Sequence, residues 1–131
     1  MSDFSEYTAG QVVDWMSQGT VATPPTNLFV TVFDSSGTEL DASFDNARAS
    51  TTTGPDWDVT NTAFVNADEI DLGEALNDVT DVQDIALYDA ETGGNEIARY
   101  ALTDNPFDVA EGSFLVFEPG EIDFNVIDRT E

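Results

Sequence analysis

Residues 82–102 read VQDIALYDAETGGNEIARYAL and carry the clearest structural signal in the chain. The segment alternates around Ile85 and Leu87, and a period of two is typical of a β-strand. Glycine and asparagine in 91–95 mark a turn, and a second apolar run follows at 97–102. Two such runs joined by a glycine-containing turn predict a β-hairpin.

Short apolar runs separated by turn residues continue on both sides of this hairpin. Residues 28–33 are β-branched, aromatic or aliphatic, and the turn 34–37 follows them. Further short strands are expected at 57–59, 63–66, 69–72 and 107–109, with a second hairpin that joins 113–117 to 122–127 around Pro119 and Gly120. Residues 41–56 indicate a loop or a weak edge strand, with Phe44 as an anchor. Many short strands with turns between them favour an all-β fold, and we predict an antiparallel β-sandwich.

The N-terminal segment differs from the rest of the chain. Apolar residues at near-helical spacing, with Gly19 as a stop, predict a short helix over residues 4–18. Pro24 and Pro25 then form a stiff extended connector, because proline fixes φ. We therefore divide the chain into an N-terminal helical arm, residues 1–22, and a β-sandwich domain, residues 23–131. The helix either packs on the sheet of its own domain or contacts a second subunit, since aromatic residues are enriched in interface cores.

Three groups of residues follow from this division. The core of the sandwich is expected to contain Phe29, Phe33, Ile85, Leu87, Phe114, Phe117 and Phe124. The seam with neighbouring chains is expected to contain Phe4, Tyr7, Val12, Trp15 and Met16. The turns near Gly37, Gly94 and Gly120 are expected at the ends of the sandwich, where binding loops are common.

The charge balance of the chain is strongly acidic. Asp and Glu number 27 against 3 arginines and no lysine, so the formal net charge is -24. Such a chain repels itself in dilute buffer, whereas molar salt shortens electrostatic screening to about 3 Å. The acidic residues are spread along the chain and form no block, which is unlike an interaction tail. The composition therefore predicts a protein from a halophile or from a virus that infects one.

Missing residue types exclude many functions. The chain has no His, Cys or Lys, which removes catalytic triads, thiolate nucleophiles, Schiff bases and phosphate-binding lysines. Its cations are Arg48, Arg99 and Arg129, which are scattered, so no basic patch for nucleic acid is expected. No run reaches the roughly 18 apolar residues that span a membrane, and the N-terminus lacks the pattern of a secretory signal. We expect neither an enzyme nor a cofactor.

Carboxylate clusters offer one further kind of site. Asp78, Asp81 and Asp84 are spaced by threes, and Asp89 and Glu91 precede a Gly-Gly pair. Calcium takes six to eight oxygen ligands, but the chain has no D-x-[DN]-x-[DN]-G loop. We therefore favour a solvated acidic surface over a metal site.

Several segments resemble a family of small virion proteins of tailed viruses, labelled tail fibre or minor tail proteins. Residues 12–33 are similar to the family's short helix and its G-x-x-x-x-x-P-x-x-x-Y-V-A-L pattern, with Gly19, Pro24 or Pro25, Asn27, Phe29 and Val30 in those places. Residues 85–97 resemble its I-A-L-Y-D-A-x-T-G-G-N-x-L segment, and 101–103 and 109–114 keep the order. The loop 41–54 departs from the family's longer polar loop. The resemblance covers roughly residues 10–127.

The resemblance implies a non-enzymatic structural protein of the virion. Such a protein would form a homo-oligomeric attachment on the tail or on the capsid surface, as a decoration or turret component, with other virion proteins as partners. Together with the composition, it implies a haloarchaeal tailed virus assembled in the host cytoplasm. Two alternatives stay open: a host-surface adhesion module that binds envelope glycan or S-layer through cation-bridged loops, and a small acidic binding domain or regulator of a halophilic cell.

Overall fold

A computed structural model describes residues 3–20, 23, 25–60, 63–102 and 107–125. One helix precedes eleven short strands: α1 (Glu6–Gln18), β1 (Asn27–Phe33), β2 (Ala49–Thr52), β3 (Trp57–Thr60), β4 (Ala63–Asn66), β5 (Ile70–Glu74), β6 (Val79–Val82), β7 (Asp84–Tyr88), β8 (Glu96–Ala101), β9 (Phe107–Val109), β10 (Phe114–Phe117) and β11 (Asp123–Asn125). The fold is the predicted all-β sandwich with a short N-terminal helix.

The hairpin predicted from residues 82–102 lies at the edge of the largest sheet. β7 and β8 pair in antiparallel register, with Ile85 opposite Tyr100. β1 lies on the other side of β7, and β2 completes the order β2-β1-β7-β8. Alternation and the glycine turn therefore predicted this hairpin correctly, and the β-branched and aromatic run at 28–33 predicted β1 correctly. Residues 41–56, expected as a loop or weak edge strand, contain β2 at the edge of the sheet and a buried Phe44.

The second predicted hairpin is wrong. β10 pairs with β5, and β11 pairs with β4 in the separate sheet β11-β4-β3. The side chain of Asn66 explains the separation: its amide donates to the carbonyl of Glu118 at 2.9 Å and its oxygen accepts from the Ile122 N–H at 2.9 Å. This buried amide holds the Pro119–Gly120 turn against β4, so the two strands enter different sheets. Val126 and Ile127, the end of the predicted strand, lie outside the described residues.

Burial of the predicted core residues depends more on their position in the strand alternation than on the size of their side chains. Of the predicted core residues, Phe33, Ile85, Leu87, Phe117 and Phe124 are buried. Phe29 is half-buried, because Val30 and Val32 occupy the core-facing positions of β1. Phe114 is 63% exposed, which contradicts the prediction. Phe114 and Phe117 are three residues apart and therefore cannot share one face of a regular strand.

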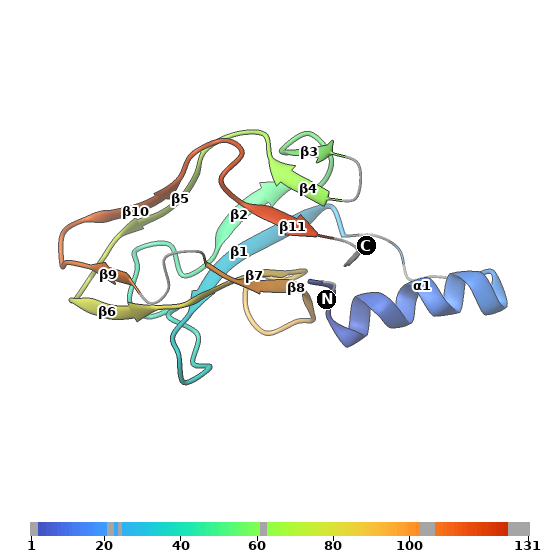
Figure 1. Cartoon of the computed structure of the whole chain (residues 1–131), viewed down its shortest axis with the longest axis horizontal. Coiled ribbons are helices and arrows are strands. Elements are labelled where there is room, and N and C mark those ends of the chain that lie inside the picture. Colours follow the sequence, from blue (N-terminus) through green and yellow to red (C-terminus); the bar gives the residue numbers. More distant parts are fainter. Residues whose placement is uncertain (1–2, 21–22, 24, 61–62, 103–106, 126–131) are drawn as a thin grey trace, which may run out of the picture.

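Figure 1 shows α1 leaving the strand-rich body at one end of the long axis of the molecule. The strands β6, β9 and β10 lie toward the opposite end. Among the described residues, no helix has the length and apolar character needed to cross a membrane. The shape is thus a body of stacked short sheets with one projecting helix.

Candidate functional site

Both ends of α1 are set by local sequence. The helix begins after Ser5, whose hydroxyl accepts a hydrogen bond from the Thr8 N–H at 3.2 Å, and this cap satisfies an N–H that the helix leaves unpaired. It ends at Gly19, which has a φ of 71° and donates its N–H to the Trp15 carbonyl at 3.0 Å. Glycine adopts this left-handed conformation at little cost. The predicted helix and its stop at Gly19 are therefore confirmed, but the helix begins at Glu6 and not at Phe4, which forms a β-bridge with Ala98.

The root of α1 is fixed to the body by hydrogen bonds. The Asp3 N–H donates to the Asn125 carbonyl at 3.0 Å, and the Asn125 N–H donates to the Asp3 carboxylate at 2.7 Å. The Ser5 N–H and the Thr8 hydroxyl both donate to the Ile97 carbonyl, at 2.9 and 2.8 Å. Residues 3–8 are thereby held between β8 and β11, and the direction in which α1 projects is fixed.

The Asp3 carboxyl at this root has a shifted pKa. Burial raises the pKa above its ordinary value of 3.8, and the neighbouring negative charge of Asp123 raises it further. The hydrogen bond from Asn125 acts in the opposite direction without cancelling the rise. A proton on Asp3 is therefore favoured when the root is docked.

The second half of α1 has no such support. All residues from Val12 to Gln18 are exposed, and four of them are large and apolar. We call Val12, Val13, Trp15 and Met16 the α1 tip; Trp15 is 62% exposed and Met16 is 76% exposed. Helices of about 12–15 residues are marginal in water unless an apolar face is packed. The α1 tip is therefore a surface whose burial would stabilise the helix that carries it.

A shallow apolar cleft runs along one side of the helix. It has a volume of about 310 Å³ and is lined by Phe4, Thr8, Gln11, Val12 and Trp15. At a helical period of 3.6 residues these positions share one face. This is the face that Thr8 presents to β8. The side of α1 that packs on the body in its first turn thus continues past the body into the α1 tip.

The five residues predicted at an intersubunit seam are divided between the root and the tip. Phe4 is half-buried and packs against the core of its own chain, and Tyr7 is also half-buried. Val12, Trp15 and Met16 are exposed. Of the two interpretations that the sequence left open, packing on the domain's own sheet describes the root. A contact with a second subunit stays a prediction for the tip.

The α1 tip lies in a long stretch of the sequence that has few charged residues. Between residues 7 and 33 the chain contains one charged residue, Asp14, although Asp and Glu number 27 in the whole chain. Like charges that face each other across an interface oppose binding. This helix therefore offers a surface that another acidic molecule can approach with little repulsion.

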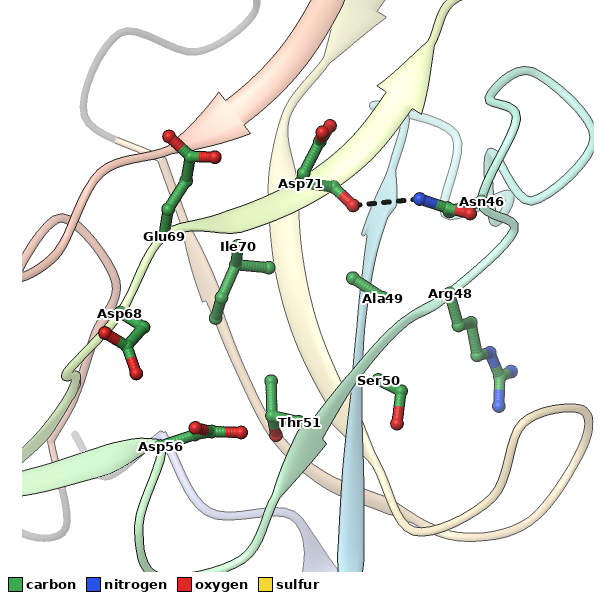
Figure 2. Close-up of a pocket in the computed structure, with 10 residues that line it drawn as sticks. All are labelled: Asn46, Arg48, Ala49, Ser50, Thr51, Asp56, Asp68, Glu69, Ile70 and Asp71. Atoms are coloured by element: carbon green, nitrogen blue, oxygen red, sulfur yellow. Dashed lines mark hydrogen bonds between the residues drawn. The ribbon is translucent and has the colours of Figure 1, made fainter.

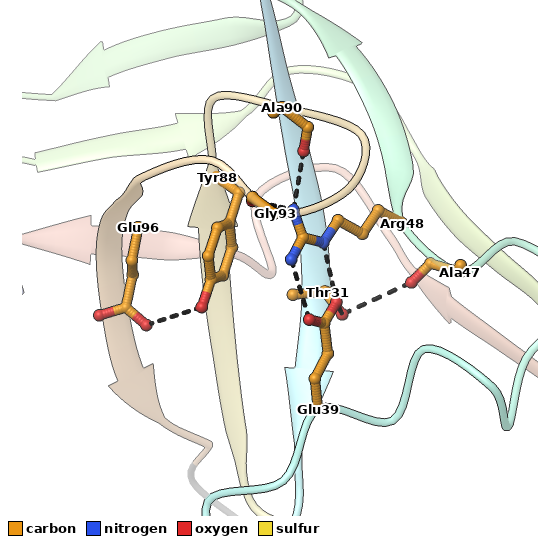
Figure 3. A network of polar contacts seen from close by, with 8 residues as sticks. All are labelled: Thr31, Glu39, Ala47, Arg48, Tyr88, Ala90, Gly93 and Glu96. Atoms are coloured by element: carbon orange, nitrogen blue, oxygen red, sulfur yellow. Dashed lines mark hydrogen bonds and ion pairs between the residues drawn. The ribbon is translucent and has the colours of Figure 1, made fainter.

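Arg48, which directly precedes β2, is the centre of a network of polar contacts (Figure 3). Its guanidinium forms a two-bond pair with the Glu39 carboxylate, at 2.8 and 2.9 Å, and donates to the carbonyls of Ala90 and Gly93 at 2.8 and 2.9 Å. The same group lies 4.0 Å above the centre of the Tyr88 ring. One buried cation thus joins the segment before β2 to the turn that follows β7.

The pKa values around Arg48 agree with this geometry. The hydrogen bond from Arg48 lowers the pKa of Glu39 below its ordinary value of 4.5, despite partial burial, and the hydroxyl of Thr31 lowers it further. Burial raises the pKa of the Tyr88 hydroxyl, and the charge of Glu96 adds to the rise. Glu39 and Arg48 therefore stay ionised as a pair, with a structural role.

Arg99 is used in a similar way. Its guanidinium bonds to Glu96 at 2.9 Å, lies 3.7 Å from the Asp84 carboxylate, and covers the Phe33 ring at 3.7 Å. Both arginines in the described part of the chain are thus engaged internally, and Arg129 lies outside it. Within the described residues, the exposed charges are carboxylates.

A polar cleft of about 330 Å³ lies between β2 and the start of β5 (Figure 2). Its lining residues are Asn46, Arg48, Ala49, Ser50, Thr51, Asp56, Asp68, Glu69, Ile70 and Asp71. Several of its polar groups serve the fold: Asp56 accepts from the Thr52 N–H at 2.6 Å, and Asn46 donates to the Asp71 carbonyl at 3.1 Å. The lining side chains of the cleft carry carboxylate, hydroxyl, amide and guanidinium groups.

The predicted carboxylate clusters do not converge. Asp78 accepts from the Glu111 N–H at 2.9 Å, Asp81 accepts from the Ser35 N–H at 3.1 Å, and Asp84 lies beside Arg99. Asp89 closes its own turn by accepting from Asn95 at 2.7 Å. Among the residues that the structure describes, no three acidic side chains form a group that could hold a metal ion.

Comparison with protein families gives a match over nearly the whole described length. Residues 3–125 match the family described as podophage GP4 fiber I protein gp80. The chain belongs to this family. No curated protein matches the chain.

Membership of this fibre family agrees with the resemblance to tail fibre proteins inferred from the sequence. The Tyr-Asp-Ala-x-Thr-Gly-Gly-Asn run that carried part of that resemblance is the turn between β7 and β8. Its second glycine, Gly94, has a φ of 75°, and a Cβ there would lie 2.6 Å from Ala90 Cβ. This turn therefore requires glycine for both its backbone angle and its packing.

Sequence reasoning missed the Arg48 network and the exposed Phe114. A lone arginine in a polar loop gives no signal of its partners, because Glu39, Ala90 and Gly93 are brought to it by pairing between distant strands. The position of Phe114 carried a usable signal, since Leu115 and Phe117 already fill the inward positions of β10.

Proposed function

We propose that the chain is a non-enzymatic structural subunit of a virion fibre, and that copies of it assemble as a homo-oligomer through the α1 tip. Membership of the fibre family supports the virion role. The observation that carries the assembly is the α1 tip itself: four large apolar side chains stand exposed on a helix whose charged residues are Glu6 and Asp14. Exposed apolar patches of this kind mark protein–protein contacts.

The acidic body explains why assembly would use this surface. With a formal net charge of -24, two copies repel each other over most of their surfaces in dilute buffer. Burial of apolar area contributes about 25 cal/mol per Å², and this term does not depend on charge. Molar salt removes most of the repulsion, because screening then acts over about 3 Å. Assembly in concentrated salt, on a virus of a halophilic host, suits both properties.

Sedimentation velocity in molar KCl tests the assembly. We expect the wild-type chain to form a concentration-dependent oligomer and the double variant Trp15→Ser/Met16→Ser to sediment as a monomer. Gln18→Ser, at an exposed polar position of the same helix, is the matched control and should assemble like the wild type. A monomeric wild-type chain, or a tip variant that assembles normally, would overturn the proposal.

The salt requirement has its own test. Urea unfolding of the wild-type chain at increasing KCl should give a midpoint that rises steeply between low and molar salt, as carboxylate repulsion is screened. A midpoint that is independent of KCl would rule out the halophilic setting while leaving the fibre role intact.

Adhesion to the host envelope is a second candidate function. One feature favours it: Arg48 holds the turn after β7 in a fixed conformation through the carbonyls of Ala90 and Gly93, and a preorganised loop loses less entropy on binding. The turn near Gly37 follows the end of β1, and β1 is antiparallel to β7. The turn near Gly37 and the turn after β7 therefore lie at opposite ends of the β1–β7 pair. Binding to purified host envelope, with and without a calcium chelator, tests adhesion through bridging cations; no binding in either condition argues against it.

A further inference from the structure

The exposed large apolar side chains of the described residues fall into two groups. Four of them form the α1 tip, and the other two are Leu76 and Phe114, which are 52% and 63% exposed. We call Leu76 and Phe114 the Phe114 patch. Single exposed apolar residues are common on protein surfaces, so the question is whether this pair forms one surface.

The strand pair β5–β10 brings the two residues to the same end of the sheet. Phe114 lies opposite Glu74 in the β5–β10 pair, and Leu76 is two residues beyond Glu74. Residues in this diagonal relation lie on the same face, within reach of aromatic side chains. The backbone here is fixed, since the Ala75 N–H donates to the Ser113 carbonyl and the Leu76 N–H to the Ser43 carbonyl, both at 2.8 Å. Both side chains are therefore exposed at this end of the β5–β10 pair, where one partner surface can cover them together.

The α1 tip and the Phe114 patch lie at opposite ends of the molecule. Figure 1 shows α1 at one end of the long axis and the strands β6, β9 and β10 toward the other. Phe114 is the first residue of β10, and Leu76 lies between β5 and β6. A contact between two different surfaces at opposite ends is heterologous, and such contacts repeat to give rings or open filaments.

Charge favours contact between unlike surfaces at the Phe114 patch. Exposed acidic residues stand beside the patch, with Glu74 across from Phe114 and Glu111 in the preceding turn. Two copies of the patch facing each other would bring these carboxylates together, at a cost in repulsion. The α1 tip, with Asp14 as its one charged neighbour between residues 7 and 33, approaches the same patch with much less repulsion. A contact between two α1 tips would leave the Phe114 patch in water.

We propose that the α1 tip of one copy docks on the Phe114 patch of the next copy, so that subunits add head to tail along the long axis. This inference rests on the proposed homo-oligomeric assembly and specifies the surface that receives the helix. Each internal subunit takes part in two contacts of this kind, one through its tip and one through its patch, and together they cover the six large apolar side chains that are exposed among its described residues.

Mixing two defective variants tests the head-to-tail contact. The tip variant Trp15→Ser/Met16→Ser retains a working patch, and the patch variant Phe114→Ser retains a working tip. In molar KCl each variant alone should sediment as a monomer. Their mixture should form a one-to-one dimer and nothing larger, because one working tip meets one working patch. Phe114→Leu, which keeps the patch apolar, should assemble like the wild type.

The outcomes separate the inference from the proposed function. If the patch variant assembles normally while the tip variant is monomeric, the tips pair with each other; the inference fails and the proposed function stands. If the wild-type chain is monomeric, both fail. A mixture that forms no dimer also overturns the inference. Should Phe114→Ser lower the urea midpoint, Leu76→Ser, which lies outside the strands, replaces it in the same mixture.

Discussion

The interior of β1 and the α1 tip are both rich in apolar residues, but those of β1 are buried and those of the α1 tip are exposed. Val30 and Val32 of β1 are buried by the strands around them. Val12 and Val13 of α1, residues of the same type, are exposed on a helix that leaves the body. The difference arises because β1 is paired on both sides by β2 and β7, whereas α1 contacts the body through its first turn.

This contrast separates two uses of hydrophobic burial. Apolar residues in the sheets stabilise the single subunit, and their removal should lower its free energy of unfolding. Apolar residues in the α1 tip contribute little to the isolated subunit, and their removal should change assembly alone. The following predictions test how sharply the two regions differ.

The largest expected effect is on the aromatic core. Phe124 is fully buried and contacts the rings of Trp57, Phe64 and Tyr100. Phe124→Ala should lower the free energy of unfolding by about 3–5 kcal/mol, as large-to-small core substitutions do. Met16→Ala in the α1 tip should change it by less than about 0.5 kcal/mol, measured by urea unfolding of the monomer. Equal losses at the two positions would remove the distinction between body and tip.

The Arg48 network should give the next largest effect. Arg48→Met removes hydrogen bonds to Glu39 and to two carbonyls, and should cost about 1.5–3 kcal/mol, the range for hydrogen bonds to charged groups. Arg48→Lys should recover little of this loss, because an ammonium cannot form the two-bond pair with Glu39. Urea unfolding of the three chains measures both effects; full recovery by lysine would mean that charge alone matters.

A smaller loss of stability is expected from alanine substitutions at two glycines that have similar backbone angles and therefore form a matched pair. Gly37 and Gly94 have φ values of 83° and 75°, and a Cβ at Gly37 meets no atom within 4 Å, whereas one at Gly94 would lie 2.6 Å from Asp89 Oδ1. Gly37→Ala should cost about 1–2 kcal/mol for the left-handed conformation. Gly94→Ala should cost more than that, since the turn must also move. A smaller loss at Gly94 would contradict the packing of this turn.

The smallest expected effects concern pH. The raised pKa of Asp3 means that its contribution to stability is fully present below pH 3.8 and is lost as pH rises through the folded-state pKa. The lowered pKa of Glu39 means that its contribution is present above pH 4.5 and is lost as pH falls through the folded-state pKa. At pH 7, Glu39→Gln should therefore be less stable than the wild type and Asp3→Asn at least as stable. Urea midpoints measured from pH 7 down to pH 3 check both; slopes of the reverse sign would contradict the two pKa directions.

Local patterns predicted the elements better than the way they pair. The hairpin at 82–102, the helix and most short strands follow from alternation, glycine turns and caps within a few residues. The second hairpin failed because Asn66, about fifty residues earlier in the chain, holds the intervening turn. The size of Phe29 and Phe114 predicts a place in the core, but alternate residues of a strand point to opposite faces, and these two lie at positions that face away from it.

The sequence predicted only the part of the candidate site that local patterns could indicate. The α1 tip is a continuous stretch of sequence, so its apolar residues could be recognised before the fold was known. The Phe114 patch joins the first residue of β10 to Leu76, which lies just beyond the end of β5, and no pattern within either segment indicates the other. Long-range pairing thus limits what one sequence can predict about surfaces.

Burial of Trp15 on assembly is the most direct measure of the proposed contact. The chain has two tryptophans, so in the variant Trp57→Phe the tryptophan fluorescence comes from Trp15 alone. The assembly of this variant is first compared with that of the wild-type chain. In molar KCl, Trp15 should be quenched freely by acrylamide at low protein concentration. Its quenching should fall and its emission should shift to the blue as the oligomer forms. Free quenching of Trp15 in a fully assembled sample would contradict assembly through the α1 tip.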